Sequence, residues 1–133
     1  MKLISSIKIL FLIFFWTHSH AGEMNSWECS KFEDSKIYSD GSYLGSLGPS
    51  WNTDSIFNTS SEYSSTWSQN SIFNDNSNYG NSYSNKSAFN DTATNPPIII
   101  SKNGLMIGYL SIGPVWDSER FHPMDIKYTC DWD

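Results

Sequence analysis

Hydrophobic residues fall into three regions of the chain with different patterns. An unbroken apolar run covers residues 9–16. Short apolar segments then flank an Asp-Gly pair near residues 37–47 and an Asn-Gly pair near residues 98–110, which predicts β-strands in both places. Between these regions, residues 50–95 are rich in Ser and Asn and poor in aliphatic side chains. The pattern therefore predicts a leader, two strand-forming regions and a polar middle.

The two strand-forming regions resemble two copies of one hairpin module, which we place at residues 37–54 and 98–117. The segment IYSDGSYLGSL aligns with ISKNGLMIGYL, and a Gly-Pro-x-Trp motif follows in both copies. Asp40-Gly41 and Asn103-Gly104 supply the positive φ angles that a two-residue type I′ turn requires. The sequence therefore predicts two β-hairpins in one small antiparallel sheet.

The two-residue turns also predict the strand register. Ile37 should face Leu44 in the first hairpin, and Ile100 should face Ile107 in the second. The opposite face of each hairpin also carries apolar residues. We therefore expect both faces of the sheet to be covered.

Within the polar middle, residues 55–95 carry large side chains that recur at intervals of 16 residues. The residues in register are Phe57, Phe73 and Phe89; Asn58, Asn74 and Asn90; Tyr63 and Tyr79; and Trp67 and Tyr83. A fixed period indicates that each unit has the same surroundings. We expect Phe to be the inward anchor of each unit, and Ser and Asn side chains to cap backbone groups in turns. A short solenoid and irregular turns packed on the sheet both satisfy this pattern, and the small number of units favours the turns.

The first 21 residues have the features of an export signal. Lys2 and Lys8 flank the start, the apolar run follows, and Ser19-His20-Ala21 provides small residues for cleavage. The apolar run is about half the length of a membrane span, so a signal peptide is favoured over a spanning helix. Residues 22–133 then form one small domain, exported to the periplasm or beyond the cell, with no membrane span. Removal of two of the eight basic residues leaves a formal charge of −8, which disfavours nucleic acid as a partner.

Two cysteines lie near the ends of the exported domain, in mirrored settings at residues 27–29 and 130–132. If Cys29 paired with Cys130 across antiparallel strands, Trp27 would face Trp132. Export favours a disulfide here over two buried free thiols. In this arrangement Cys130 ends a strand that begins at Ile126.

The repeated motifs resemble those of uncharacterised exported bacterial proteins with tandem Ser-Ile-x-Asn-x-Tyr-Gly units. The matching segments are Ser55-Ile56-Phe57-Asn58, Ser71-Ile72-Phe73-Asn74, Tyr79-Gly80, Asn95-Pro96-Pro97 and Gly108-Tyr109-Leu110. Thr59-Ser60 and Asp75-Asn76 depart from the Tyr-Gly of that pattern. The resemblance implies a repeat architecture and no particular activity.

Residue types for catalysis or metal binding are scarce. His122 is the only histidine after the signal, and we interpret it as structural. Asp75 begins an Asn-rich segment that is a weak calcium candidate, because one carboxylate is too few for a strong site. We therefore expect no cofactor and no enzymatic activity.

Two classes of function remain in view besides an enzyme. The first is a structural or interaction protein of the cell envelope with an unidentified partner. The second is a module that binds carbohydrate or cell wall through exposed aromatic rings. The candidate ligand-binding aromatics are Trp51, Tyr63, Trp67, Tyr79, Tyr83 and Trp116. The exposure of these rings discriminates between the two classes.

Overall fold

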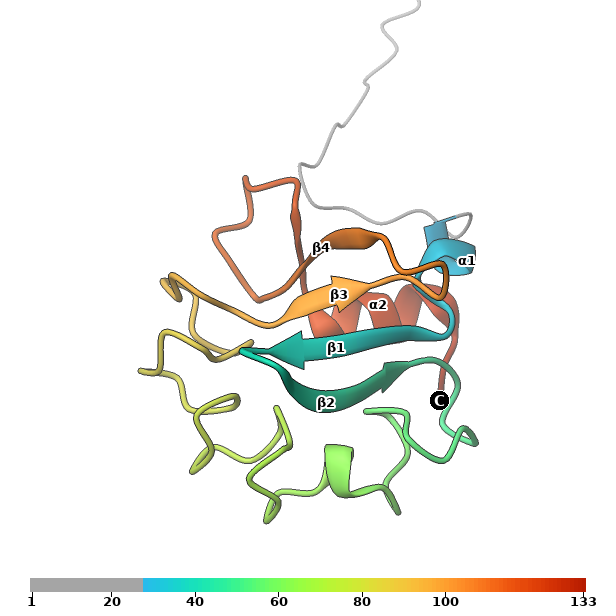
Figure 1. Ribbon diagram of the computed structural model, residues 1–133, viewed down its shortest axis with the longest axis horizontal. Coiled ribbons are helices and arrows are strands. Elements are labelled where there is room, and N and C mark those ends of the chain that lie inside the picture. Colours follow the sequence, from blue (N-terminus) through green and yellow to red (C-terminus); the bar gives the residue numbers. More distant parts are fainter. Residues whose placement is uncertain (1–27) are drawn as a thin grey trace, which may run out of the picture.

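The chain forms a mainly β domain around one mixed sheet (Figure 1). The computed structural model describes residues 28–133, so the predicted signal peptide and Trp27 lie outside the described residues. The five strands have the order β2-β1-β3-β4-β5. The elements are α1 (Cys29–Phe32), β1 (Ser35–Ser39), β2 (Ser42–Leu47), η2 (Glu62–Ser64), β3 (Ile98–Ile100), β4 (Met106–Leu110), β5 (Arg120–Phe121) and α2 (Pro123–Cys130).

The first hairpin has the predicted turn. Asp40 and Gly41 have φ angles of 47° and 81°, and Tyr38 pairs with Tyr43. A register shift then separates this pair from the next, so the regular pairing predicted at Ile37 is interrupted by a bulge. Gly45 lies in the bulge with a φ of 102°, a conformation that favours glycine.

The predicted register of the second hairpin is wrong. Ile100 pairs with Met106 instead of Ile107, and the pairing shifts after Ile99. Ser101 is the physical reason: its carbonyl accepts a hydrogen bond from Gly104 N, and its Oγ accepts one from Leu105 N. These bonds close a longer loop than the two-residue turn that the sequence suggested.

The two hairpins join in one sheet, as predicted, because β1 and β3 pair antiparallel. The sheet is not purely antiparallel, however. The short strand β5 pairs parallel with β4, after a loop that returns the chain to the same edge of the sheet.

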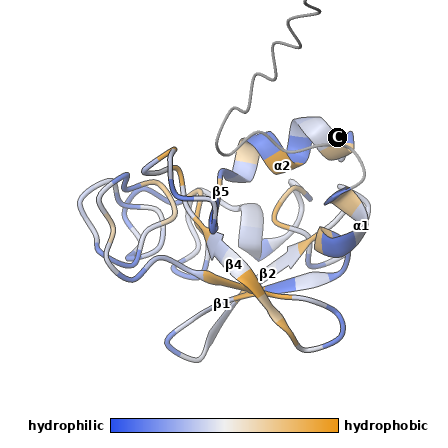
Figure 2. Cartoon of the chain, turned by 90° about the horizontal axis from the view of Figure 1, so that it is seen from above, coloured by the Kyte–Doolittle hydropathy of each residue, from blue (hydrophilic) through white to orange (hydrophobic). Residues whose placement is uncertain are grey.

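The hydrophobic core lies between one face of the sheet and α2. Figures 1 and 2 show α2 on one side of the strands. The core residues that are completely buried include Phe32, Ile37, Leu44, Leu47, Ile99, Leu110 and Ile126. Tyr38, Ile98, Ile100 and Tyr109 alternate with these positions and are only half-buried. The face opposite α2 is therefore covered less completely than the core face.

A disulfide joins Cys29 to Cys130, as predicted, with the two Cα atoms 5.5 Å apart. Both cysteines lie in helices, so the predicted strand pairing around them is wrong. The segment expected to form a strand from Ile126 is α2, which begins with Pro123 and is capped by His122, whose Nδ1 accepts a hydrogen bond from Met124 N at 3.1 Å.

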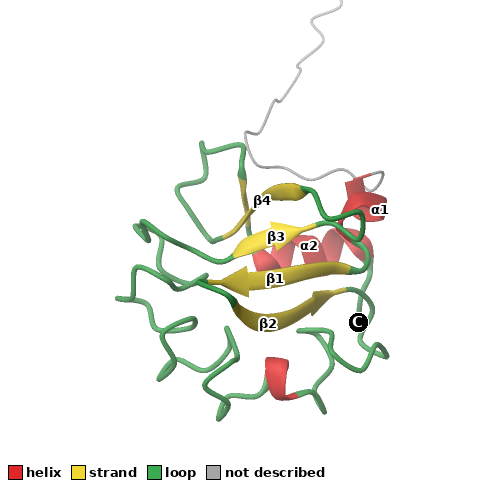
Figure 3. Cartoon of the chain, viewed as in Figure 1, coloured by secondary structure: helices red, strands yellow, loops and turns green. Residues whose placement is uncertain are grey.

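The polar middle runs along the β2 edge of the sheet, mostly as turns and bends (Figures 1 and 3). It is attached at its start by backbone pairing of Ser55 with Ser46. Farther along, Lys86 forms an ion pair of 2.8 Å with Asp40 at the tip of the first hairpin. In residues 28–133, no helix has both the length and the apolar character needed to cross a membrane.

Candidate ligand-binding surface

Serine side chains fix the start of each 16-residue unit. Ser55, Ser71 and Ser87 are completely buried. The Oγ of each accepts a hydrogen bond from the backbone N–H two residues later, at 3.1, 3.1 and 3.0 Å respectively. These contacts are local turns of the kind that serine favours, and they occur at equivalent positions in all three units.

Asparagine side chains hold the next step of each unit in the same way. The Oδ1 atoms of Asn58, Asn74 and Asn90 accept hydrogen bonds from the N–H two residues later, at 2.9, 3.0 and 3.1 Å. Their Nδ2 atoms each donate to the carbonyl six residues earlier, at 2.9 Å in every case. The same hydrogen bonds therefore recur at intervals of 16 residues.

The aliphatic residue of each unit, rather than Phe, is the most deeply buried. Ile56, Ile72 and Ala88 are completely buried. Phe57 is also buried, but Phe73 and Phe89 are half-buried and pack against each other with ring centroids 5.7 Å apart. Phe73 and Phe89 also pack against the core cluster, so the three phenylalanines are inward-packed but unequally buried. Ile56 N donates to Ser46 O on β2, which directs this position toward the core.

Three aromatic side chains at equivalent positions point away from the protein. Trp51, Trp67 and Tyr83 are 75%, 89% and 92% exposed. Each precedes the residue whose carbonyl accepts the Asn Nδ2 hydrogen bond of its unit. We call these three residues the aromatic series. The sequence signal was available, since Trp51 lies 16 residues before Trp67.

The other candidate aromatics do not belong to this series. Tyr63 and Tyr79 are half-buried, and the Tyr63 ring contacts the Tyr43 ring at 5.1 Å. Trp116 is 76% exposed but lies in a different loop, beside a pocket of about 420 Å³ formed with residues 91–92 and 112–115. The six candidates are therefore divided into three exposed equivalent rings, two packed tyrosines and one separate tryptophan.

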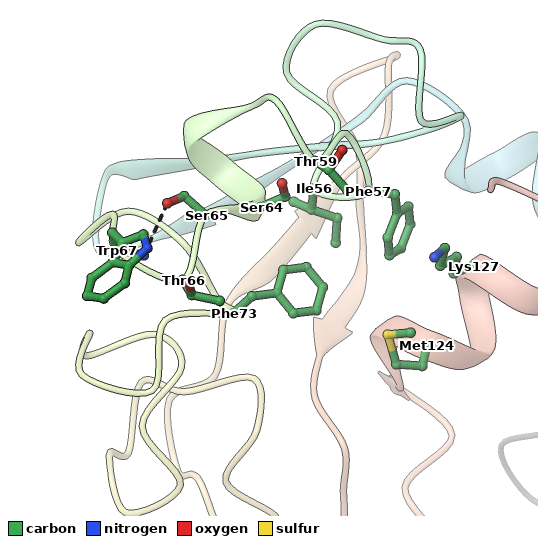
Figure 4. A pocket seen from close by; sticks show the side chains of 10 residues that line it. All are labelled: Ile56, Phe57, Thr59, Ser64, Ser65, Thr66, Trp67, Phe73, Met124 and Lys127. Atoms are coloured by element: carbon green, nitrogen blue, oxygen red, sulfur yellow. Dashed lines mark hydrogen bonds between the residues drawn. The ribbon is translucent and has the colours of Figure 1, made fainter.

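A pocket of about 430 Å³ opens beside Trp67, between the polar middle and α2 (Figure 4). Its lining combines apolar side chains, hydroxyl groups and one cation. The lining residues are Ile56, Phe57, Thr59, Ser64, Ser65, Thr66, Trp67, Phe73, Met124 and Lys127. Its volume is within the range of pockets that hold one small ligand. We call it the Lys127 pocket.

The carboxylate of Asp54 links the start of the polar middle to strand β2. It accepts hydrogen bonds from the Tyr43 hydroxyl and, at 2.8 Å, from Ser46 Oγ. The Tyr43 hydrogen bond holds the pKa of Asp54 below its usual range. Burial, together with the Asp54 contact, raises the pKa of Tyr43. Both groups are occupied with each other and hold the packing of this region.

The described residues provide little for metal binding. In residues 28–133, no three His, Cys, Asp or Glu side chains are grouped so that they could hold a metal ion. Asp75 is exposed, beside an Asn74 whose side chain is used within the turn. His122 Nδ1 is used in capping α2.

Comparison of the chain with protein-family models, with curated proteins and with solved structures finds no match. We therefore infer function from the exposed residues and the pockets of this domain.

Proposed function

We propose that this protein is an exported interaction module, without enzymatic activity, whose aromatic series binds a glycan. The observation that carries the proposal is the exposure of Trp51, Trp67 and Tyr83, which lie at equivalent positions in successive units. A ring of this size, exposed by three quarters or more, adds little to a folded core. A ligand that is itself built from repeated units accounts for the placement of three such rings at equivalent positions.

The chemistry of the surface suits a sugar polymer. Pyranose rings present C–H groups on their faces, which are attracted to the negative face of an aromatic ring. Their hydroxyl groups require hydrogen-bonding partners, and the exposed side chains of the polar middle include Thr59, Thr66 and Asn76. Residues 22–133 carry six basic and 14 acidic side chains, a formal charge of −8, which disfavours a polyanionic ligand.

Export is supported by the disulfide, because such bonds persist in oxidising compartments. It is also supported by the signal-like sequence of residues 1–21. A glycan of the cell envelope or of the extracellular space is accessible from such a location.

The proposal is tested by affinity electrophoresis of residues 22–133 through gels containing individual neutral polysaccharides, followed by titration calorimetry on those that retard the protein. Trp67→Ala should weaken binding at least about tenfold, which corresponds to 1.4 kcal/mol. The matched control is Trp116→Ala, which removes a ring that is 76% exposed and lies outside the series.

The thermal melts of both variants should equal that of the original chain, because neither ring is in the core. Retardation by no polysaccharide, or equal losses in the two variants, would overturn the proposal. In that case a protein of the cell envelope becomes the favoured class of partner.

A further inference from the structure

The Lys127 pocket has a charge opposite to that of the molecule. Its lining contains one cation, Lys127, and no carboxylate, although acidic residues outnumber basic ones 14 to eight in the whole sequence. Asp133, which pairs with Lys127, lies outside this lining. A single cation in the lining of an acidic protein favours an acidic group that is isolated on its ligand, since a polyanion would be repelled by the remaining surface.

The ammonium of Lys127 is held beside aromatic rings and is only weakly paired. Its Nζ lies 6.0 Å from the Phe57 ring centroid and 5.9 Å from that of Tyr128. The ion pair with Asp133 spans 3.5 Å, and the Asp133 side chain is 73% exposed. A charge-assisted hydrogen bond is shorter than this, at about 2.7–2.9 Å. The Lys127 side chain is 25% exposed, but the pair is long and its acidic partner is in water. A loose, solvent-screened pair of this kind is worth little, so a ligand carboxylate can replace Asp133 at low cost.

The rest of the lining is suited to the body of a sugar. Figure 4 shows Trp67 at one side of the pocket, Phe73 in the middle, and Phe57 with Lys127 on the opposite side. Within residues 28–133, the hydroxyls of Thr59 and Thr66 have no hydrogen-bond partner in the protein. Aromatic faces, free hydroxyls and one cation together match one ring with an apolar face, hydroxyl groups and a single carboxylate.

The pocket is continuous with the aromatic series, because Trp67 belongs to both. We infer that the Lys127 pocket binds one acidic sugar residue, such as a hexuronic acid, carried by an otherwise neutral glycan. In this arrangement the carboxylate binds Lys127 Nζ, the ring of the acidic sugar lies beside Phe73 in the middle of the pocket, and a neighbouring neutral sugar residue stacks on Trp67. This inference rests on the proposed glycan binding and adds the class of sugar that is selected.

The test uses two oligosaccharides that differ in one functional group. One is a neutral hexose oligomer, and the other is the same oligomer with C6 of its terminal residue oxidised to a carboxylate. Titration calorimetry at low salt should show the acidic oligomer binding at least about tenfold more tightly. Since surface ion pairs are screened by salt, the ratio of the affinities for the acidic and the neutral oligomer should fall at about 1 M NaCl.

Three variants test whether Lys127 causes the preference for the acidic oligomer. Lys127→Gln should bring the ratio of the two affinities close to one, and Lys127→Arg should restore part of that ratio. Lys102→Gln is the matched control, because Lys102 is exposed and lies outside this pocket, and it should keep the full preference. Near-UV circular dichroism checks that each variant is folded.

Equal affinities for the two oligomers, or a preference that persists in Lys127→Gln, would overturn the inference and leave glycan binding by the aromatic series intact. Binding of neither oligomer at millimolar concentration would overturn both. The two failures are therefore distinguishable.

Discussion

Replacement of Asn74 by Ala tests whether asparagine side chains hold the polar middle together. Asn74 is 2% exposed. Its Nδ2 donates to Ser68 O at 2.9 Å, and its Oδ1 accepts from Asn76 N at 3.0 Å. Alanine removes both bonds without adding bulk, so the change measures the hydrogen bonds more than the packing.

The expected loss of stability depends on whether water can replace Asn74 at its two partners, Ser68 O and Asn76 N–H. Each side-chain bond contributes about 0.5–1.5 kcal/mol net, and a buried group left without a partner costs about 1–3 kcal/mol. Ser68 is half-buried, so its carbonyl is partly deprived of water, whereas Asn76 is exposed and its N–H can be solvated. We therefore expect Asn74→Ala to lower the free energy of unfolding by about 2–3 kcal/mol, of a total near 5–15 kcal/mol.

The measurement is urea unfolding followed by tryptophan fluorescence and near-UV circular dichroism. With a slope of about 1–3 kcal/mol/M, the midpoint should fall by roughly 0.7–3 M at constant slope. Asn74→Asp keeps the Oδ1 acceptor but turns an oxygen toward the Ser68 carbonyl, so it should lose at least as much. Asn76→Ala removes an exposed amide and should stay within about 0.5 kcal/mol. Equal, small losses for Asn74→Ala and Asn76→Ala would refute the reasoning.

Three other predictions follow from burial and bonding. The Cys29–Cys130 bond joins residues separated by 101 positions in the sequence. Its reduction should destabilise the protein by up to about 4.7 kcal/mol and lower the melting temperature. An unchanged melt of the fully reduced protein would contradict this. Ile72→Ala should cost about 2–5 kcal/mol in urea unfolding, because Ile72 is completely buried; a cost below about 1 kcal/mol would show that the site is not part of the core. The pKa of Asp54 is lower in the folded protein than the value of about 3.9 expected in the unfolded chain. The Asp54 carboxylate therefore stabilises the fold above about pH 3.9, and this contribution is lost as the pH falls through the pKa of the folded protein. Asp54→Asn should therefore lower stability at pH 7 and reduce the acid-induced loss, and an unchanged slope of stability against pH below about 4 would count against it.

The parts of the fold that the sequence predicts are those set by short-range chemistry. Asp40-Gly41 determines a turn of two residues by its positive φ angles, and that turn is present. The second hairpin carries a similar Asn-Gly signal, but Ser101 bonds to the loop and changes the register. A one-residue shift of this kind depends on a contact that strand propensity does not contain.

The helix at the end of the chain was missed for a related reason. Pro123 at the first helical position, Asp125 in the first turn and Lys127 in the last turn are helix signals. The helix has only eight residues, and Ile126 and Thr129 are β-branched, so propensity favoured a strand. The packing of Ile126 in the core outweighs that local preference. This helix supplies Met124 and Lys127, so the Lys127 pocket was not predictable without it.

The structure separates the residues that hold the polar middle together from those that are available to a partner. Ser and Asn side chains bond the backbone of each turn, and Ile56, Ile72 and Ala88 supply the buried contacts. The aromatic residues at 51, 67 and 83 belong to neither group. In a domain whose middle has few aliphatic residues, large rings would stabilise the fold most if they were buried. That they lie outside is hard to reconcile with selection for stability alone, and it is the physical argument for a ligand at these positions.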